Sequence, residues 1–178
     1  MDGNFWVFAY GSLMWRPDFE FVGRHAATLH GWHRSMCILS TIYRGCPEKP
    51  GLVLGLDRGG SCRGLAYQIA DAKADEVRQY LFDREMVTNA YHPRFAPARL
   101  ADGRIVPVYI FTVRKDHEQY SGPLSQAETL QLVRQGHGKG GSSRDYLANT
   151  VENMTALGIR TSALHRLLAM VDGKTKPS

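Results

Sequence analysis

One carboxylate in the sequence has the placement expected of a group that transfers protons. The spacing of apolar residues predicts a helix over residues 74–86, and Val77, Tyr80 and Leu81 define its buried face. At about 100° per residue, the same geometry puts Glu85 at the rim of that face. A carboxylate held against apolar surface has a raised pKa, which suits it to take and return a proton near neutral pH. A frayed helix end that leaves Glu85 in solvent is the alternative interpretation.

The same helix carries a second glutamate. Glu76 precedes Glu85 by nine residues, which is about half a turn around the helix axis. The two carboxylates therefore cannot share one site unless the helix bends, and we expect one working acid. Arg84 falls near the middle of the apolar stripe, whereas Asp83 points outward.

A turn after the first apolar run is the other feature that could take part in chemistry. Residues 5–13 are rich in aromatic and β-branched side chains, which predicts a buried strand that ends in a tight turn. Gly11 can adopt a positive φ and has no side chain, so the N–H groups that follow could face a bound anion or a carbonyl oxygen. An ordinary glycine turn at a strand end is the alternative.

Several familiar catalytic motifs are missing. The run at residues 136–141 spells GxGxxG, but it follows a predicted helix, which favours a flexible loop over a dinucleotide site. Lys139 is followed by glycine, so there is no Walker loop. Ser12 and Ser61 both lack the GxSxG elbow of serine hydrolases.

The cysteines and histidines do not predict a metal site. Cys37, Cys46 and Cys62 are odd in number and widely spaced, which favours reduced thiols over a disulfide framework. His30 and His33 lie in or beside a strand-like run, so packing or surface roles are favoured over zinc binding. We expect an enzyme of this sequence to need no metal, no cofactor and no covalent nucleophile.

Length and charge limit the classes of function. With 178 residues and 43% hydrophobic side chains, the chain predicts a single domain over residues 1–173, followed by a frayed tail over residues 174–178. The net charge of +5 is spread over single arginines, which favours small anionic ligands and not nucleic acid.

No stretch approaches the ~20 apolar residues that span a bilayer, and residues 1–4 lack the basic start of a secretory signal. We expect a soluble, cytosolic protein that binds no membrane; its oligomeric state is not predicted.

Periodicity and turn signals predict an α+β fold, with an antiparallel sheet that closes toward a barrel. The predicted strands are residues 5–13 and 32–41, a hairpin of residues 51–57 and 62–69 around residues 58–61, and a hairpin of residues 94–100 and 105–113 around Asp102 and Gly103. The predicted helices are residues 74–86, a helix capped at Ser125 that ends near Gly136, a helix capped at Ser142 or Ser143 that ends at Gly158, and residues 162–171.

Several groups of residues, in chain order, resemble one known family. They are residues 7–15, residues 40–41 with 44–51, residues 64–67, residues 84–86 with Tyr91, and residues 145–147 with 149–152. This set is similar to the ChaC family of γ-glutamylcyclotransferases, from about Trp6 to the C-terminal helices. The resemblance implies a mixed β-barrel with peripheral helices. It also implies a lyase of glutathione catabolism that cleaves glutathione into 5-oxoproline and Cys-Gly.

The resemblance also implies roles for particular residues. Glu85 matches the catalytic acid/base of the family, and Glu76 matches a second glutamate with a supporting role, which the helix geometry disfavours as a direct participant. Arg44 and Arg34 could pair with the carboxylates of glutathione, or could lie on a solvated strand edge. Tyr10 and Tyr91 could wall the site or pack in the core. The expected substrate-binding residues are Val7, Phe8, Ala9, Tyr10, Gly11, Ser12, Leu13, Arg44 and Tyr91.

The chain departs from the family pattern at two places, and at the second of them, the link before Tyr91, it resembles the bacterial branch of the family more closely. Ala9 stands where glycine is common, and the link at residues 86–90 is longer than the glycine-containing link of animal members. Link length over the site could alter substrate choice.

The expected reaction is an internal cyclisation. The α-amine of the substrate attacks its own γ-carbonyl, so the nucleophile arrives with the substrate. Glu85 moves the proton from the ammonium to the departing cysteine nitrogen, and N–H groups of the turn at Gly11 and Ser12 hold the oxygen on which charge develops. Two alternatives stay open, namely a cyclotransferase for other γ-glutamyl amines or dipeptides, and a non-catalytic module that binds γ-glutamyl compounds.

Overall fold

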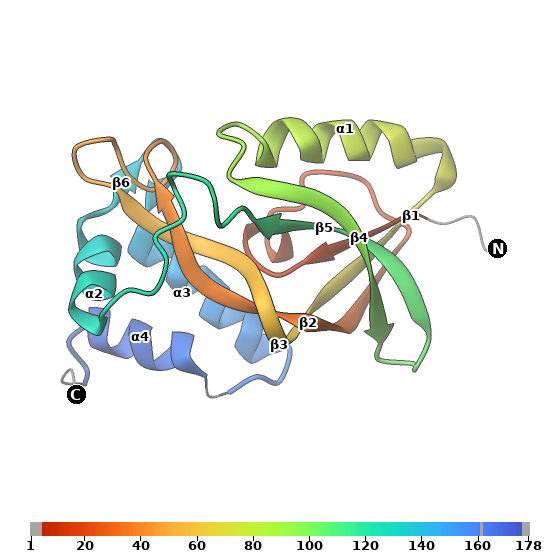
Figure 1. Cartoon of the computed structure of the whole chain (residues 1–178). Helices are drawn as coiled ribbons and strands as arrows, with labels where there is room; N and C mark the ends of the chain where they lie inside the picture. The colour runs from red at the N-terminus through yellow and green to blue at the C-terminus, as the bar shows by residue number, and fades with distance from the viewer. Residues whose placement is uncertain (1–4, 161, 176–178) are drawn as a thin grey trace. The chain divides into compact units, whose positions relative to one another are not determined.

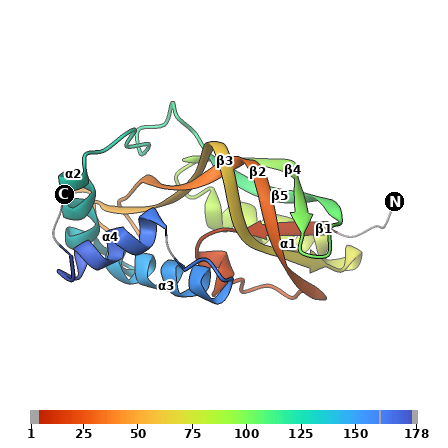
Figure 2. The ribbon, with the colours of Figure 1, turned by 90° about the horizontal axis from the view of Figure 1, so that it is seen from below.

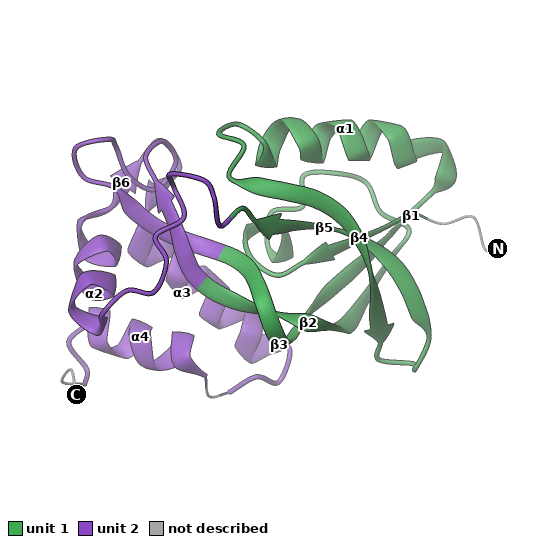
Figure 3. Cartoon of the chain, in the orientation of Figure 1, with its two compact units in different colours: residues 1–35, 55–114 green, residues 36–54, 115–178 purple. Residues whose placement is uncertain are grey.

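The computed structural model describes residues 5–160 and 162–175 (Figure 1). The chain divides into two compact units, residues 1–35 with 55–114 and residues 36–54 with 115–178 (Figure 3). Both boundaries inside the first 60 residues fall within long strands. The prediction of one domain over residues 1–173 stays a prediction, and residues 176–178 of the predicted tail lie outside the described residues.

Five strands form a closed barrel, and each of them lies wholly or mostly in the first unit. The strands are β1 (Phe5–Ala9), β2 (Gly23–Ser40), β3 (Gly51–Ile69), β4 (Tyr91–Leu100) and β5 (Ile105–Val113), in the order β1-β3-β2-β4-β5. Antiparallel pairing joins β1 to β3, β2 to β4 and β4 to β5, whereas β5 pairs in parallel with β1 and β3. The barrel core contains fully buried side chains from every strand, among them Val7, Leu29, Leu56, Leu100 and Ile110. The predicted α+β fold with a mixed barrel is confirmed.

The third strand corrects one prediction. Residues 51–69 form a single strand and not the predicted hairpin around residues 58–61. Gly59 and Gly60 adopt positive φ values of 98° and 66° inside it, which is typical of a bulge that bends a strand without reversing it. The second strand likewise begins at Gly23, nine residues before the predicted start, and contains Gly31 at a φ of 82°. Glycine pairs mark a change of backbone direction, but they do not tell a bend from a turn.

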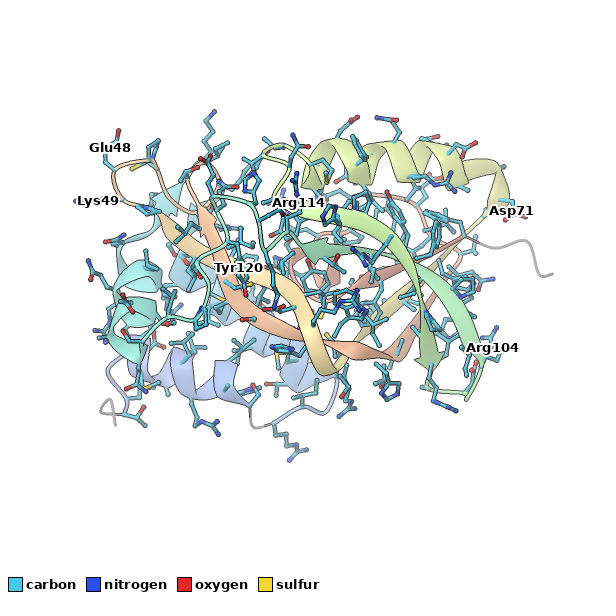
Figure 4. All side chains as sticks on the ribbon, viewed as in Figure 1. Glu48, Lys49, Asp71, Arg104, Arg114 and Tyr120 are labelled. Atoms are coloured by element: carbon cyan, nitrogen blue, oxygen red, sulfur yellow. The ribbon has the colours of Figure 1, made fainter. Side chains whose placement is uncertain are left out.

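The β4–β5 hairpin was predicted correctly. Its register runs from Tyr91 opposite Val113 to Arg99 opposite Ile105. Gly103 has the positive φ, 89°, that the turn requires. Arg104 lies at this end of the hairpin (Figure 4) and donates to the carboxylate of Asp102.

One helix lies along the barrel within the first unit (Figure 1). Helix α1 (Ala74–Glu85) follows the short 3-10 helix η2 (Asp71–Lys73) and ends one residue before the predicted end. Val77 and Leu81 are buried, as the periodicity predicted. The guanidinium of Arg78 lies 5.2 Å from the centre of the Phe5 ring, so α1 is fixed against the first strand of the barrel.

Three helices lie side by side in the second unit, in both views (Figures 1 and 2). They are α2 (Gln126–Gln135), α3 (Ser143–Ala156) and α4 (Ala163–Val171). Ser125 and Glu128 form the predicted capping box of α2, and Ser142 caps α3. Arg134 donates to the carbonyl oxygen of Met170 at 2.7 Å, which joins α2 to α4. None of the helices in the described part of the chain has the length and apolar character to cross a bilayer.

The glycine-rich run at residues 136–141 is not the flexible loop that the sequence favoured. It contains a short hairpin of β6 (His137–Gly138) and β7 (Gly141–Ser142), packed within the second unit against the β2–β3 loop. The N–H groups of Lys139 and Gly140 donate to carbonyl oxygens of that loop. A Cβ atom on Gly136 would overlap the backbone at Gly51. The glycines therefore allow this hairpin and the β2–β3 loop to pack with their backbones close together. Glu48 and Lys49 lie on the facing loop (Figure 4).

Candidate active site

The turn after β1 is a short 3-10 helix, η1 (Ser12–Met14). Gly11 precedes it with a φ of −132°, so the turn does not use the positive φ that a glycine allows. The N–H of Met14 donates to the carbonyl of Gly11 at 2.9 Å. The N–H groups of Ser12 and Leu13 find no acceptor among the residues that the structure describes. These two donors remain for a ligand oxygen.

Side chains from two other strands hold this turn. Arg34 on β2 donates from Nε to the carbonyl oxygen of Tyr10 at 2.6 Å. The Tyr67 hydroxyl on β3 donates to the carbonyl oxygen of Leu13 at 3.1 Å. Donors fixed in this way need no reorganisation when charge develops on a bound oxygen. The turn is therefore a preorganised set of main-chain groups.

Arg84, in the last turn of α1, connects the helix to the same turn. Its Nη2 donates to the Ser12 hydroxyl at 3.2 Å, and its Nη1 donates to the Arg16 carbonyl at 2.8 Å and to the Tyr80 hydroxyl at 2.9 Å. Its Nε lies 3.5 Å from Oε1 of Glu85. One guanidinium thus contacts both the turn and the candidate acid. An arginine in the middle of an apolar stripe must find such partners. The sequence alone assigns Arg84 no role, and its place in the stripe is the signal that could have found one.

Glu85 is the last residue of α1, and about 20% of its side chain is exposed. Burial raises the pKa of this carboxyl group, and the charge of Arg84 lowers it in part. The C-terminal end of a helix carries partial negative charge, which also disfavours the carboxylate. Apart from Arg84, no partner holds Glu85 in the described part of the chain. A carboxyl group with a raised pKa and remaining access to solvent can exchange protons with a ligand.

Glu76 is placed quite differently. It lies in the first turn of α1, with 70% of its side chain exposed, and forms an ion pair with Lys73 at 2.8 Å. This is a surface pair with a neighbour one turn away. The number of working acids on this helix stays a prediction.

The other predicted binding residues of β1 are buried. Val7, Phe8 and Ala9 lie in the barrel wall with almost no exposed surface. The Tyr10 ring is also buried, and its hydroxyl donates to the carbonyl oxygen of Phe111 at 3.1 Å. Side chains packed in this way set the position of the turn that follows them. Their role in substrate binding stays a prediction.

Three further predicted residues lie at different places. Tyr91 is half-buried at the start of β4, in the same unit as Glu85. Arg34 holds the turn, as described above. Arg44 belongs to the second unit, where its guanidinium donates to the carbonyl oxygen of Gly140 and lies 5.5 Å from the Tyr146 ring centre. Arg44 thus has a packing role of its own, and binding by Arg44 or Tyr91 stays a prediction.

Neither a thiolate nor a metal site accompanies Glu85 in the described residues. Burial raises the pKa of Cys62, which keeps its sulfur as a thiol. Within the described residues, no three His, Cys, Asp or Glu side chains are grouped in a way that could hold a metal ion. The site offers proton transfer at one carboxyl group and hydrogen-bond donation from a fixed turn.

Comparison with known proteins shows the family to which the chain belongs. The family model for the ChaC-like protein matches residues 5–174. The chain belongs to this family. One relative is the glutathione-specific γ-glutamylcyclotransferase of Escherichia coli, which is 34% identical over 170 residues; the match covers 96% of this chain and 74% of the relative. Another is the mouse glutathione-specific γ-glutamylcyclotransferase 1, 29% identical over 94% of this chain and 76% of the relative.

A solved structure shows the same ChaC-like fold. The crystal structure of a yeast γ-glutamyl cyclotransferase specific to glutathione superimposes with a TM-score of 0.83. Its sequence is 25% identical, and the match covers 96% of this chain and 99% of the yeast chain. The barrel and the helices described above are therefore those of this enzyme fold.

Proposed function

We propose that this chain is a glutathione-specific γ-glutamylcyclotransferase that releases 5-oxoproline and Cys-Gly. The observation that carries the proposal is the mostly buried Glu85, linked through Arg84 to a turn with two available N–H donors. The similarity to the Escherichia coli enzyme over nearly the whole chain supports the substrate. Glutathione catabolism is then the process that the protein serves.

The reaction needs a single carboxyl group from the protein. Glu85 removes a proton from the substrate α-ammonium, and the amine nitrogen forms a bond to the γ-carbonyl carbon. The bond from that carbon to the cysteine nitrogen then breaks as Glu85 returns the proton to the departing nitrogen. The new ring nitrogen gives up its second proton, which the released Cys-Gly amine takes up to leave as an ammonium. The proton count balances, and the ring closes within one bound molecule, which gives a large advantage in effective concentration.

The turn after β1 supplies the second component. Negative charge develops on the γ-carbonyl oxygen when the amine attacks. We assign the N–H groups of Ser12 and Leu13 as its hydrogen-bond donors, because the structure gives them no acceptor in the described residues and Arg34 and Tyr67 fix the turn. Val7, Phe8 and Ala9 contribute to the reaction because their packing fixes the position of this turn.

The test is turnover of glutathione by the wild type and by Glu85→Gln. We expect 5-oxoproline and Cys-Gly in equal amounts from the wild type, and a loss of kcat of roughly 10²–10⁴ in the variant. Asp83→Asn is the matched control, because Asp83 lies on the same helix, is exposed and accepts a hydrogen bond from Gln79. A wild type that releases no 5-oxoproline refutes the function, and an active Glu85→Gln variant removes Glu85 from the mechanism.

A further inference from the structure

Two arginines stack on one buried tryptophan in the barrel. Trp32 lies on β2, and the guanidinium carbons of Arg58 and Arg94 lie 4.5 Å and 5.3 Å from its ring centre. The arginines come from β3 and β4, the two neighbours of β2 in the strand order. Each contact is favourable by itself, because the ring face is negative. Together they bring two positive charges to one ring.

The two guanidinium charges have no anionic partner in the part of the chain that the structure describes. In the described residues, neither the Arg58 nor the Arg94 guanidinium forms an ion pair with a carboxylate. The nearest acid in sequence, Asp57, accepts from the main-chain N–H of Arg58 at 2.6 Å. Nε of Arg94 is buried and has no acceptor in the described ranges, residues 5–160 and 162–175. An unmatched buried donor is costly, and two like charges repel, so an anion bound here would relieve both penalties.

Trp32, the ring that the two arginines share, lies two residues along β2 from a side chain that contacts the turn after β1. Trp32 and Arg34 are two residues apart on β2, so they share a face and their Cα atoms are about 7 Å apart. Arg34 donates to the carbonyl oxygen of Tyr10, at the start of that turn. An extended tripeptide spans about 10 Å. A glutathione molecule whose γ-glutamyl group lies at the turn can therefore extend its other end toward Trp32.

We propose that Arg58 and Arg94 bind the glycine carboxylate of glutathione, with Trp32 as the platform that orients their guanidinium groups. The inference rests on the proposed function. Guanidinium groups present donors that match the two oxygens of a carboxylate. The pair makes the enzyme select the tripeptide over γ-glutamyl compounds that end without this carboxylate.

The test measures binding without turnover. In the Glu85→Gln background, calorimetry compares glutathione with γ-glutamylcysteinyl-glycinamide, which lacks only the terminal charge. We expect glutathione to bind tighter by about tenfold or more, the range for a charge-assisted hydrogen bond. Adding Arg94→Met or Arg58→Met should reduce the affinity for glutathione to that for the amide and leave the affinity for the amide unchanged. Arg94→Lys should restore part of the difference, because it keeps the charge.

Arg99→Met is the control, because Arg99 is exposed on the same strand, opposite Ile105. It should leave the affinities for both ligands unchanged. Equal affinity for the acid and the amide in the parent protein overturns the proposal. So does an Arg94→Met variant whose affinity for the amide falls as much as its affinity for glutathione, since that marks a packing role. A wild type that shows the binding difference but releases no 5-oxoproline refutes the proposed function and leaves the carboxylate site in place.

Discussion

Nη2 of Arg84 lies 3.2 Å from the hydroxyl oxygen of Ser12, which ties the last turn of α1 to the turn after β1. The next residue on the helix is Glu85, whose carboxylate lies 3.5 Å from Nε of the same arginine. The two components assigned to the reaction are therefore fixed relative to each other by one side chain. Removal of that side chain should affect both their geometry and the pKa of the acid.

Substitution of Arg84 should change the pH dependence of turnover. The positive charge of Arg84 lowers the pKa of Glu85 against the effect of burial. Arg84→Met removes the charge, so the pKa should rise further and the acidic limb of kcat/KM against pH should move to higher pH. Arg84→Lys keeps the charge but loses the two hydrogen bonds to Ser12 and Arg16. For this variant kcat should fall, and the acidic limb should shift less than in Arg84→Met.

Arg78→Met is the matched control for the Arg84 variants. Arg78 lies on the same helix but contacts Asp75 and the Phe5 ring. Its pH profile should match that of the wild type. An Arg84→Met enzyme with an unmoved acidic limb would show that Arg84 does not act on the titrating group.

The stability of Glu85→Gln should depend on pH. Because folding raises the pKa of Glu85, the ionised carboxylate costs folding free energy. Below the ordinary glutamate pKa of about 4.3, the group is protonated in both states and the cost is absent. The cost grows as pH rises toward the folded-state pKa and is constant above it. Denaturant unfolding should therefore show a larger advantage of the glutamine variant at pH 7 than at pH 3.5. An advantage that grows toward acid would contradict the raised pKa.

Glycine positions on β3 and β2 should respond differently to a methyl group. A Cβ on Gly64 would overlap the carbonyl oxygen of Ala9 and approach the Phe8 ring, whereas a Cβ on Gly23 would meet the movable end of Gln68. Gly64→Ala should lower the free energy of unfolding by about 1–3 kcal/mol, because the barrel wall cannot yield. Gly23→Ala should cost much less. Thermal unfolding of both variants is the measurement, and equal melting temperatures would show that the wall at Ala9 is adaptable.

An ion pair in the second unit should contribute to acid sensitivity. Arg144 donates twice to Asp172, with both nitrogen–oxygen distances at 2.9 Å. The hydrogen bonds from Arg144 lower the pKa of Asp172. The resulting stability is present above the ordinary aspartate pKa and is lost as pH falls through the lowered value. Asp172→Asn should cost no more than about 1 kcal/mol at pH 7, because the pair lies at the surface, and the difference should vanish at low pH. A cost that persists at low pH would point to packing instead.

Local signals explain which parts of the fold could be predicted. The capping box at Ser125 and Glu128 and the turn at Gly103 depend on residues close in sequence, and both appear as expected. The buried face of α1 followed from the spacing of Val77 and Leu81. These features need no knowledge of distant segments.

Other features depend on contacts between distant segments. The bend at Gly59 and Gly60 depends on how β3 pairs with neighbours on both sides, which local turn signals do not contain. The arginines around Trp32 are 26 and 62 residues away in sequence, and only the strand order brings them together. The roles of Tyr67 and Arg84 in holding the turn were missed for the same reason.

The discontinuous make-up of the units affects synthesis and truncation. Residues 36–54 belong with a partner segment that begins only at Lys115. When a ribosome has completed β5, all five barrel strands have been synthesised. Residues 36–54 then still lack the Ser143 hydroxyl, which accepts a hydrogen bond from the N–H of Leu52. A shortened gene that stops after Arg114 would leave residues 36–54 without residues 115–178, the rest of their unit. We therefore expect that no single truncation of the chain yields either unit as an independent fragment.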